Sequence, residues 1–139
     1  MSVDAAMLAD AIAANVTAAL AEDIGPGDAT ASLLDDAPEH AYLLCKEACV
    51  LAGRPWFDAT HRALDPAVRI DWHCDEGARL AKGTVIATLH GRSRALVSAE
   101  RTSLNFLQTL SGTATVTAQY VDAVRGTGTR ILDTRKTLP

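Results

Sequence analysis

The sequence is poor in cysteine and has no excess of basic residues. Its three cysteines are Cys45, Cys49 and Cys74, and an odd number without a secretory leader indicates reduced thiols of the cytoplasm. Lysine and arginine number 13 against 17 acids, which gives a formal net charge of −4. This balance disfavours nonspecific binding to nucleic acid or to an anionic membrane, so any positive site must be local.

Targeting signals and repeats are also missing from the sequence. The stretch MSVDAAMLADAIAANVTAALAED begins with an acid and lacks the basic region of a signal peptide. No uncharged segment reaches the length of a bilayer span, so we expect no membrane segment. There is no internal repeat or low-complexity run, and 139 residues suit one domain or slightly more.

Patterns typical of metal centres and catalytic triads are not evident. Cys45 and Cys49 lack both CxxC spacing and a fourth ligand, which favours buried structural thiols over a metal site. The histidines are scattered without convergent spacing: His40, His61, His73 and His90. No Ser/His/Asp order or carboxylate pair stands out, so the sequence does not indicate nucleophilic or acid–base catalysis by these groups.

The sequence alternates between helical and strand-like periodicity. Leu8, Ile12, Val16 and Leu20 recur every four residues and predict an amphipathic helix over residues 4–21. The further predicted helices are residues 55–64, residues 98–110 and a segment that ends at about residue 124. The predicted strands are residues 41–51, 68–73, 84–90 and 130–133.

Glycines and small residues separate these elements. Gly25-Pro26-Gly27 ends the first helix and leaves Asp28 and Thr30 in a loop, while Ser98 is the expected N-cap of the helix over residues 98–110. The small residues 111–115 permit a kink or close packing before the next helix. The first part is therefore predicted to be an α+β domain. The last part resembles an α/β domain with only its first strand, so we expect the sequence to be cut off.

A polar stripe follows one side of the helix predicted over residues 98–110. Arg101, Asn105 and Gln108 share this stripe by i, i+4, i+7 spacing, and Leu104 lies at its border. One interpretation is an arginine whose stem packs on apolar surface while its head reaches water. The other is an anion clamp that Arg101 offers across a domain or subunit boundary.

The sequence ends in ILDTRKTLP, which places an acid, two cations and two hydroxyls directly after two apolar residues. Strands of α/β domains carry functional residues at their carboxyl ends. Arg135 is suited to a bidentate carboxylate or phosphate contact, and Lys136 adds a compact charge. Thr134 and Thr137 flank this pair. A solvated, charged loop is the alternative interpretation.

Three stretches together resemble quinolinate phosphoribosyltransferase, the decarboxylating enzyme family of NAD biosynthesis. They are AEDIGPGDAT, ERTSLNFLQTLSGTAT and ILDTRKTLP. The resemblance implies an α+β N-terminal sandwich domain over residues 1–112, and the incomplete start of an α/β barrel phosphoribosyltransferase domain over residues 113–139. Because the family is roughly twice as long, we expect this sequence to be a truncated N-terminal portion that is inactive alone.

The resemblance also implies a reaction and a set of site residues. Members of the family convert quinolinate and phosphoribosyl pyrophosphate to nicotinate mononucleotide, carbon dioxide and pyrophosphate, using Mg2+. By resemblance Arg135 binds a quinolinate carboxylate and Lys136 serves either substrate, with Thr134 and Thr137 assisting. Arg101 resembles the arginine that reaches into the partner subunit's site of a homodimer. The magnesium ligands are expected outside these 139 residues, and the GPGDAT loop receives no role.

Three other interpretations stay open. One is a phosphoribosyltransferase-like relative associated with molybdenum transport, which shares this architecture. A second is a non-catalytic module that dimerises through its exposed sheet and the helix over residues 98–110. Exposed Ile131, Leu132 and the apolar faces of both late helices would favour its association. A third is a biotinyl-type carrier, which requires a modified Lys82 that lacks the usual flanking motif.

Overall fold

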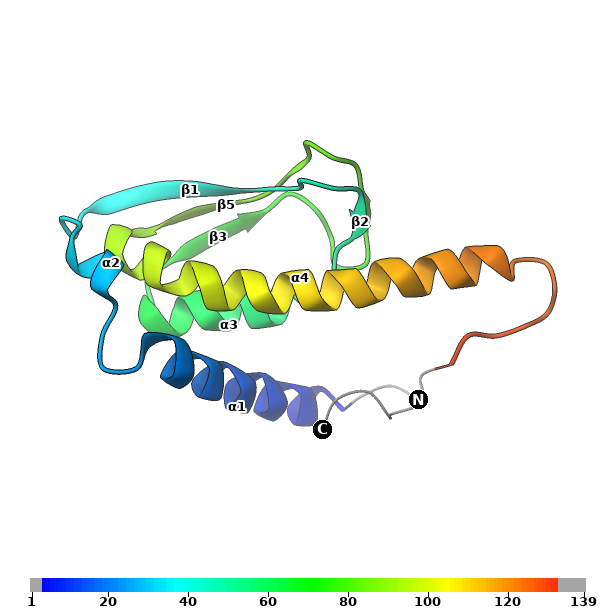
Figure 1. Cartoon of the computed structure of the whole chain (residues 1–139), viewed down its shortest axis with the longest axis horizontal. Coiled ribbons are helices and arrows are strands. Elements are labelled where there is room, and N and C mark those ends of the chain that lie inside the picture. Colours follow the sequence, from blue (N-terminus) through cyan, green and yellow to red (C-terminus); the bar gives the residue numbers. More distant parts are fainter. Residues whose placement is uncertain (1–3, 133–139) are drawn as a thin grey trace.

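The computed structural model describes residues 4–132 as a mixed arrangement of helices and antiparallel strands (Figure 1). The helices are α1 (Ala5–Ile24), α2 (Ala29–Ser32), α3 (Arg54–Leu64) and α4 (Ser93–Ala123). The strands are β1 (Pro38–Leu44), β2 (Cys49–Val50), β3 (Arg69–Trp72), β4 (Arg79–Leu80) and β5 (Val85–Arg92). The predicted α+β class is confirmed for this part of the chain.

The main sheet has three antiparallel strands in the order β1-β5-β3. The central strand β5 pairs with both neighbours, so that Leu89 stands opposite Ala41 on one side and Ile70 on the other. Strands β2 and β4 form a separate two-stranded sheet. Helices α3 and α4 lie together under the main sheet, and α1 packs on them from the side away from it (Figure 1).

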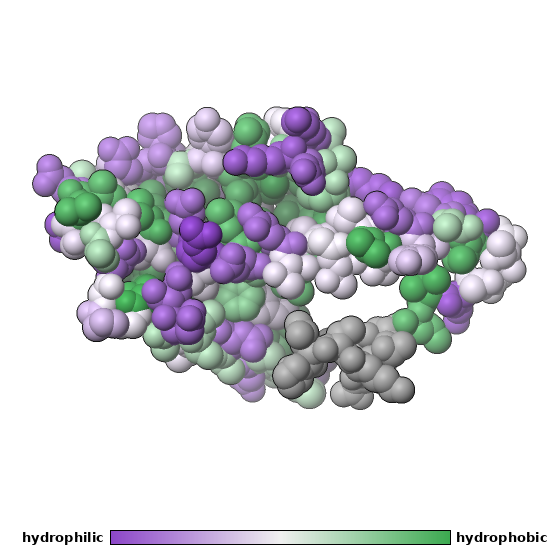
Figure 2. Space-filling model, viewed as in Figure 1, coloured by the Kyte–Doolittle hydropathy of each residue, from purple (hydrophilic) through white to green (hydrophobic). Residues whose placement is uncertain are grey.

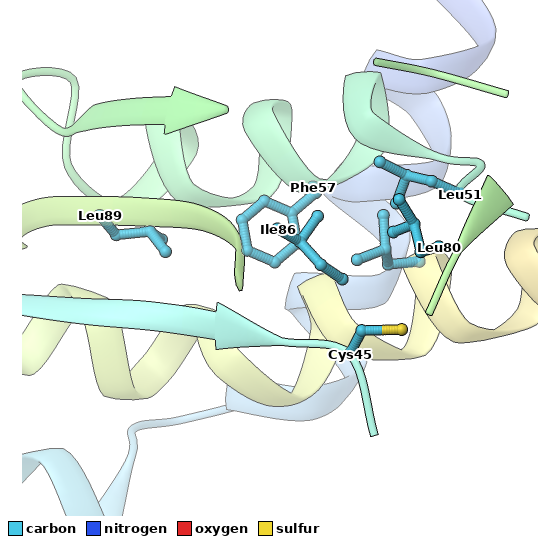
Figure 3. Packing of buried hydrophobic residues seen from close by; sticks show 7 residues of the cluster. Cys45, Leu51, Phe57, Leu80, Ile86 and Leu89 are labelled. Carbon is cyan, nitrogen blue, oxygen red and sulfur yellow. The ribbon is translucent and has the colours of Figure 1, made fainter. Parts of the chain in front are cut away.

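The core lies between the sheets and the two inner helices, and Figure 3 shows its side chains converging there. Its buried members come from strands, loops and helices that are far apart in sequence: Cys45, Leu51, Phe57, Leu80, Ile86, Leu89 and Leu107. Burying a side chain of the size of leucine or phenylalanine stabilises a fold by about 1.5–3 kcal/mol. Since these residues span both sheets, the two-stranded sheet is part of the same core.

Helix α4 is one continuous helix of 31 residues, so the prediction of a separate second helix is wrong, and the kink that residues 111–115 permit does not form. The hydroxyl groups of this run bond within the helix or to its neighbours and do not interrupt it. Thr113 Oγ1 donates to the carbonyl of Thr109 at 3.1 Å, and Thr115 Oγ1 donates to that of Ser111 at 2.6 Å. Back-bonding of this kind satisfies a hydroxyl without breaking the helix.

The small residues of this run also serve to dock β2 and the loop after it. The backbone N–H of Val50 donates to Thr115 Oγ1 at 2.8 Å, and that of Ala52 donates to Ser111 Oγ at 3.0 Å. The Ser111 hydroxyl is also 3.1 Å from the carbonyl oxygen of Ala52. The run therefore permits close packing, as predicted, without a bend.

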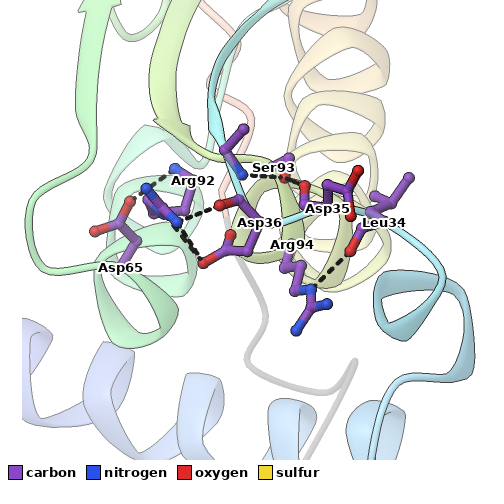
Figure 4. Close-up of polar contacts among 8 residues, drawn as sticks. Leu34, Asp35, Asp36, Asp65, Arg92, Ser93 and Arg94 are labelled. Carbon is purple, nitrogen blue, oxygen red and sulfur yellow. Dashed lines mark hydrogen bonds and ion pairs between the residues drawn. The ribbon is translucent and has the colours of Figure 1, made fainter.

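The start of α4 is held by a polar cluster rather than by the predicted N-cap Ser98, because the helix begins five residues earlier at Ser93 (Figure 4). Arg92 pairs with the Asp36 carboxylate at 2.9 Å and also donates to the Asp36 carbonyl. The backbone N–H of Arg92 donates to Asp65 Oδ2 at 3.1 Å, and Ser93 Oγ donates to the carbonyl of Asp35 at 2.7 Å. These bonds tie the segment before β1 to the end of β5.

Other predicted elements also differ from the structure. The strand predicted over residues 41–51 is in fact two strands, β1 and β2. The register of β1 against β5 shifts after Leu43. The backbone N–H of Cys45 then donates to the carbonyl of Thr84, in the turn before β5. Thr30 lies in α2 and not in a loop, since Asp28 caps that helix. Residues 130–132 form no strand, because no neighbouring segment of residues 4–132 pairs with them.

Helix α1 is long and apolar enough, by length and composition alone, to cross a membrane, with a mean hydropathy of 1.3. The expectation concerned an uncharged segment of this length, and α1 does not contradict it, because the helix includes Asp10, Glu22 and Asp23. Nine of the 20 residues of α1 are alanine, so its hydropathy comes from small side chains. The helix packs on α3 and α4, and Trp56 Nε1 donates to Asn15 Oδ1 at 3.2 Å.

Two glycines should respond oppositely to alanine. Gly53 has a φ of +105°, and an added Cβ would lie 2.9 Å from Leu110 Cδ1, whereas Gly112 lies inside α4 and faces open space. We expect Gly53→Ala to lower the free energy of unfolding by about 1–3 kcal/mol. Gly112→Ala should raise it by roughly 0.5–1 kcal/mol. Urea unfolding measures both; a stabilising Gly53→Ala would contradict the close approach of α3 to α4.

Buried His61 should make stability depend on pH. It is 4% exposed and stacks on Phe57 with ring centroids 4.6 Å apart, and burial lowers its pKa to about 4 from an ordinary 6.5. Between pH 6.5 and 4 only the unfolded chain binds this proton. The free energy of unfolding should therefore fall by up to about 3 kcal/mol as pH falls through this window.

The matched variant for this experiment is His61→Phe, which keeps an aromatic ring but cannot be protonated. Its stability should be nearly flat from pH 6.5 to 4.5. The pKa values of Asp28, Asp36 and Asp122 are held below 3.8 mainly by hydrogen bonds, so their contributions are lost only at lower pH. An equal slope in the variant and the parent protein would contradict the assignment to His61.

Candidate functional site

A cleft of about 410 Å³ separates the outer side of α4 from the segment that joins α1 to α2. We call it the Arg101 cleft. Its lining residues on α4 include Arg101, Asn105 and Gln108, and those on the other wall include Gly27, Asp28 and Thr30. The cleft thus brings together the predicted polar stripe and the GPGDAT segment, a contact that the sequence analysis did not predict.

The polar stripe is confirmed, because Arg101, Asn105 and Gln108 are all exposed on one side of α4. The opposite side of the same turns is buried, with Thr102, Ser103 and Leu107 each at most 5% exposed. Within residues 4–132 Arg101 forms no ion pair. Its guanidinium is therefore available to a group that this part of the chain does not supply.

Two hydrogen bonds fix the far wall of the Arg101 cleft to α4, one on each side of Arg101. Ser98 Oγ donates to Asp28 Oδ2 at 2.7 Å, and Thr102 Oγ1 donates to Asp23 Oδ2 at 3.0 Å. Asp28 Oδ1 accepts from the N–H of Ala31, and this bond, followed by that of Ser98, lowers the pKa of Asp28. The carboxylate is therefore charged near neutral pH and acts as a structural anchor.

The charge in the Arg101 cleft is mostly negative. Asp23, Asp28 and Glu100 line it together with the single cation Arg101. Carboxylates at this spacing oppose the binding of a dianion, so residues 4–132 do not form a complete anion site in this cleft. Of the amides next to this cleft, the N–H of Gly27 already donates to the carbonyl of Ile24, and that of Ala31 donates to Asp28 Oδ1. For Arg101 to take part in binding a dianion, further cations must come from outside residues 4–132 or from another molecule.

The other predicted site residues, Thr134, Arg135, Lys136 and Thr137, lie outside the described residues. Their roles, and any meeting with Arg101, stay predictions. Among residues 4–132 no group of three His, Cys, Asp or Glu side chains is arranged to hold a metal ion. Cys45 and Cys49 lie close together, with their sulfur atoms 3.8 Å apart, and all three cysteines are free thiols.

The two anchoring bonds predict a measurable effect on the 25–31 segment. The double variant Ser98→Ala, Thr102→Val should lower the free energy of unfolding by about 1–3 kcal/mol, since each bond contributes roughly 0.5–1.5 kcal/mol. Amide hydrogen exchange at residues 29–31 should speed up. The control is Thr113→Ala, whose hydroxyl bonds only within its own helix. If the double variant matched this control in both measurements, the anchoring role would be contradicted.

Comparison with known proteins gives concordant results. Residues 28–111 match the family model described as quinolinate phosphoribosyl transferase, N-terminal domain. A probable nicotinate-nucleotide pyrophosphorylase [carboxylating] of Synechocystis is 41% identical over 121 residues, which cover 86% of this chain and 41% of the relative. A protein of the same name from Bacillus subtilis is 40% identical over 119 residues, 85% of this chain and 41% of the relative.

Solved structures agree with this match. The nicotinate-nucleotide pyrophosphorylase of Francisella tularensis superposes with a TM-score of 0.91 at 38% identity, over 94% of this chain and 48% of that one. NadC of Streptococcus pyogenes superposes with a TM-score of 0.88 at 36% identity, with the same coverage. The chain thus spans less than half the length of these relatives. It belongs to the family of quinolinate phosphoribosyl transferase N-terminal domains.

Proposed function

We propose that this chain is the N-terminal part of a quinolinate phosphoribosyltransferase. The complete protein would convert quinolinate and phosphoribosyl pyrophosphate to nicotinate mononucleotide, carbon dioxide and pyrophosphate. The observation that carries the proposal is Arg101, which is exposed on α4 without an ion pair among residues 4–132, within a domain that matches the family model.

The substrate explains why unpaired cations are needed. Quinolinate is a pyridine with two adjacent carboxylates, and a guanidinium binds a carboxylate through two parallel hydrogen bonds. In this proposal Arg101 contacts one carboxylate group, and Arg135 contacts the other carboxylate side of quinolinate. Lys136 adds charge for either substrate, and Thr134 and Thr137 donate hydrogen bonds in the same pocket.

The acidic Arg101 cleft supports a site formed by two subunits. Since Asp23, Asp28 and Glu100 surround Arg101 on its own domain, a dianion is better bound on another surface to which Arg101 extends. We propose a homodimer in which Arg101 reaches the quinolinate bound by its partner. The free thiols and acidic net charge are consistent with a cytoplasmic protein that binds neither nucleic acid nor membrane.

The second half of α4 supports packing of a further domain. Val116, Tyr120 and Val121 are exposed by 51%, 61% and 45%, an apolar series on a helix that otherwise covers a core. We propose that residues 113–139 begin the α/β barrel domain, although α4 itself runs unbroken through the proposed boundary at residue 112. The barrel would bury these side chains and supply the remaining cations.

The catalysis in this proposal is electrostatic. Departure of pyrophosphate leaves positive charge on the ribose, and the pyridine nitrogen of quinolinate attacks it. The resulting positive nitrogen stabilises the electrons left by the departing carbon dioxide. The arginines and the lysine hold the dianion in position for both steps, so that no protein nucleophile is required. Mg2+ would neutralise the pyrophosphate; its ligands are expected beyond this chain, since none cluster among residues 4–132.

The test is steady-state kinetics on a protein that carries this chain together with the remaining length of its relatives. Arg101→Gln should lower kcat/KM for quinolinate by about 100-fold, as expected when a charged hydrogen-bonding pair loses one partner. Arg101→Lys should recover little of it, because an ammonium group does not make a bidentate contact. The 139-residue chain alone should show no turnover.

The matched control is Arg62→Gln, which removes an exposed arginine of α3 whose one ion-pair partner among residues 4–132 is Asp58 on its own helix. Its kinetics should equal those of the parent protein. Quinolinate turnover that survives Arg101→Gln would contradict the role of Arg101. Quinolinate binding that neither Arg101→Gln nor Arg135→Gln affects would favour the relative associated with molybdenum transport.

A further inference from the structure

A second cleft lies beside the Arg101 cleft, between α4 and the edge strand β1, and Val97, Glu100 and Leu104 line both. Its volume is about 290 Å³. Figure 2 shows apolar, green surface set between the polar margins of β1 and the first half of α4. The lining residues that matter most here are Ala41, Leu43, Phe57, His61, Leu89 and Leu104. We call this the His61 cleft, and the proposed reaction does not use it.

The inner end of the His61 cleft is formed by a buried histidine without a protein partner. His61 is 4% exposed and makes no hydrogen bond through its ring to residues 4–132. Every fully buried side-chain nitrogen of residues 4–132 has a hydrogen-bond partner. The ring nitrogens of His61 have none, so they are not fully buried, and His61 lines the cleft. Because these nitrogens reach solvent, water or a molecule in the cleft can satisfy their hydrogen bonds.

The rest of the His61 cleft is mainly apolar. Its walls combine aliphatic side chains of β1, β5 and α4 with the polar groups of Tyr42 and Glu100. The Phe57 ring lies against the imidazole, tilted by 45°. The Ser103 hydroxyl is already donated to the carbonyl of Glu100 at 3.1 Å. A molecule that enters therefore meets apolar surface on most sides and one hydrogen-bonding ring at the end.

Charge selects against anions in this cleft. Burial keeps the pKa of His61 near 4, so the imidazole is neutral at pH 7 and provides one donor and one acceptor. The carboxylate of Glu100 lies at the opening. Quinolinate and phosphoribosyl pyrophosphate are multiply charged anions, so neither fits this environment. A charged group of either sign would also be desolvated against the apolar walls, which favours a neutral occupant.

From this geometry we propose that the His61 cleft is a binding site for a small neutral aromatic molecule that makes one hydrogen bond to the imidazole of His61. The volume is at the small end of ligand pockets, which suits one or two fused rings. Phe57 and the leucines provide contact for the ring faces and edges, and His61 fixes the orientation. The site is independent of the proposed reaction.

The experiment uses two probes of nearly equal shape on the 139-residue chain. Indole has a ring N–H that can donate to His61, whereas indene has no such group. We follow the 15N signals of the His61 imidazole and the backbone amides by NMR during titration at pH 7. Indole should shift the His61 signals, with a Kd on the order of 1 mM. Indene should bind roughly fivefold more weakly, since it lacks one neutral hydrogen bond.

A variant at the rim avoids disturbing the core. Ala41 is exposed and lies on the same side of β1 as Leu43, so Ala41→Trp directs an indole ring into the cleft from an edge strand. This variant should fold and lose indole binding by at least tenfold. Absence of indole-induced shifts at His61 in the parent chain would overturn the proposal. Equal affinity for indole and indene, or full indole binding by Ala41→Trp, would overturn it as well.

Discussion

The packing of one long helix against both sheets is the interaction on which the rest of this structure depends. Leu107 of α4 joins the core formed by β2, β4 and β5, and Ser111 and Thr115 bind the backbone at β2 directly. The polar cluster around Arg92 fixes where this helix begins. If α4 were two helices with a bend, β2 and the loop after it would lose these hydrogen bonds, and α3 could not approach α4 at Gly53.

The same helix separates the molecule into surfaces of different chemistry. The outer side carries Arg101 beside carboxylates that are fixed by Ser98 and Thr102, and this favours contact with an anion held elsewhere. The side toward β1 is apolar and ends at neutral His61. Because α4 is anchored at several points, the backbone position of Arg101 is fixed relative to the rest of the domain. That preorganisation is what a site shared between subunits requires.

Sequence reasoning predicted most elements of the fold, because helical and strand periodicity reflect burial on one face. The Arg101, Asn105 and Gln108 stripe was predictable for the same reason. The kink permitted at residues 111–115 does not form. Small hydroxyl residues favour a break only when no neighbouring segment bonds to their hydroxyl groups, and here the backbone N–H groups of Val50 and Ala52 donate to them. The role of Ser98 depends on its hydrogen bond to Asp28, and the environment of His61 depends on the nearby strand β1. Both partners are distant in sequence, so no local pattern encodes these contacts.

The most direct test of the central claim is subunit complementation in the protein of full length. Arg101→Gln and Arg135→Gln are prepared separately, and each is expected to be inactive as a homodimer. Mixed after subunit exchange, the two variants should regain about one quarter of the parent activity, because half of the dimers are mixed and each mixed dimer contains one intact site. A mixture no more active than the separate variants would show that Arg101 and Arg135 do not meet across a subunit interface.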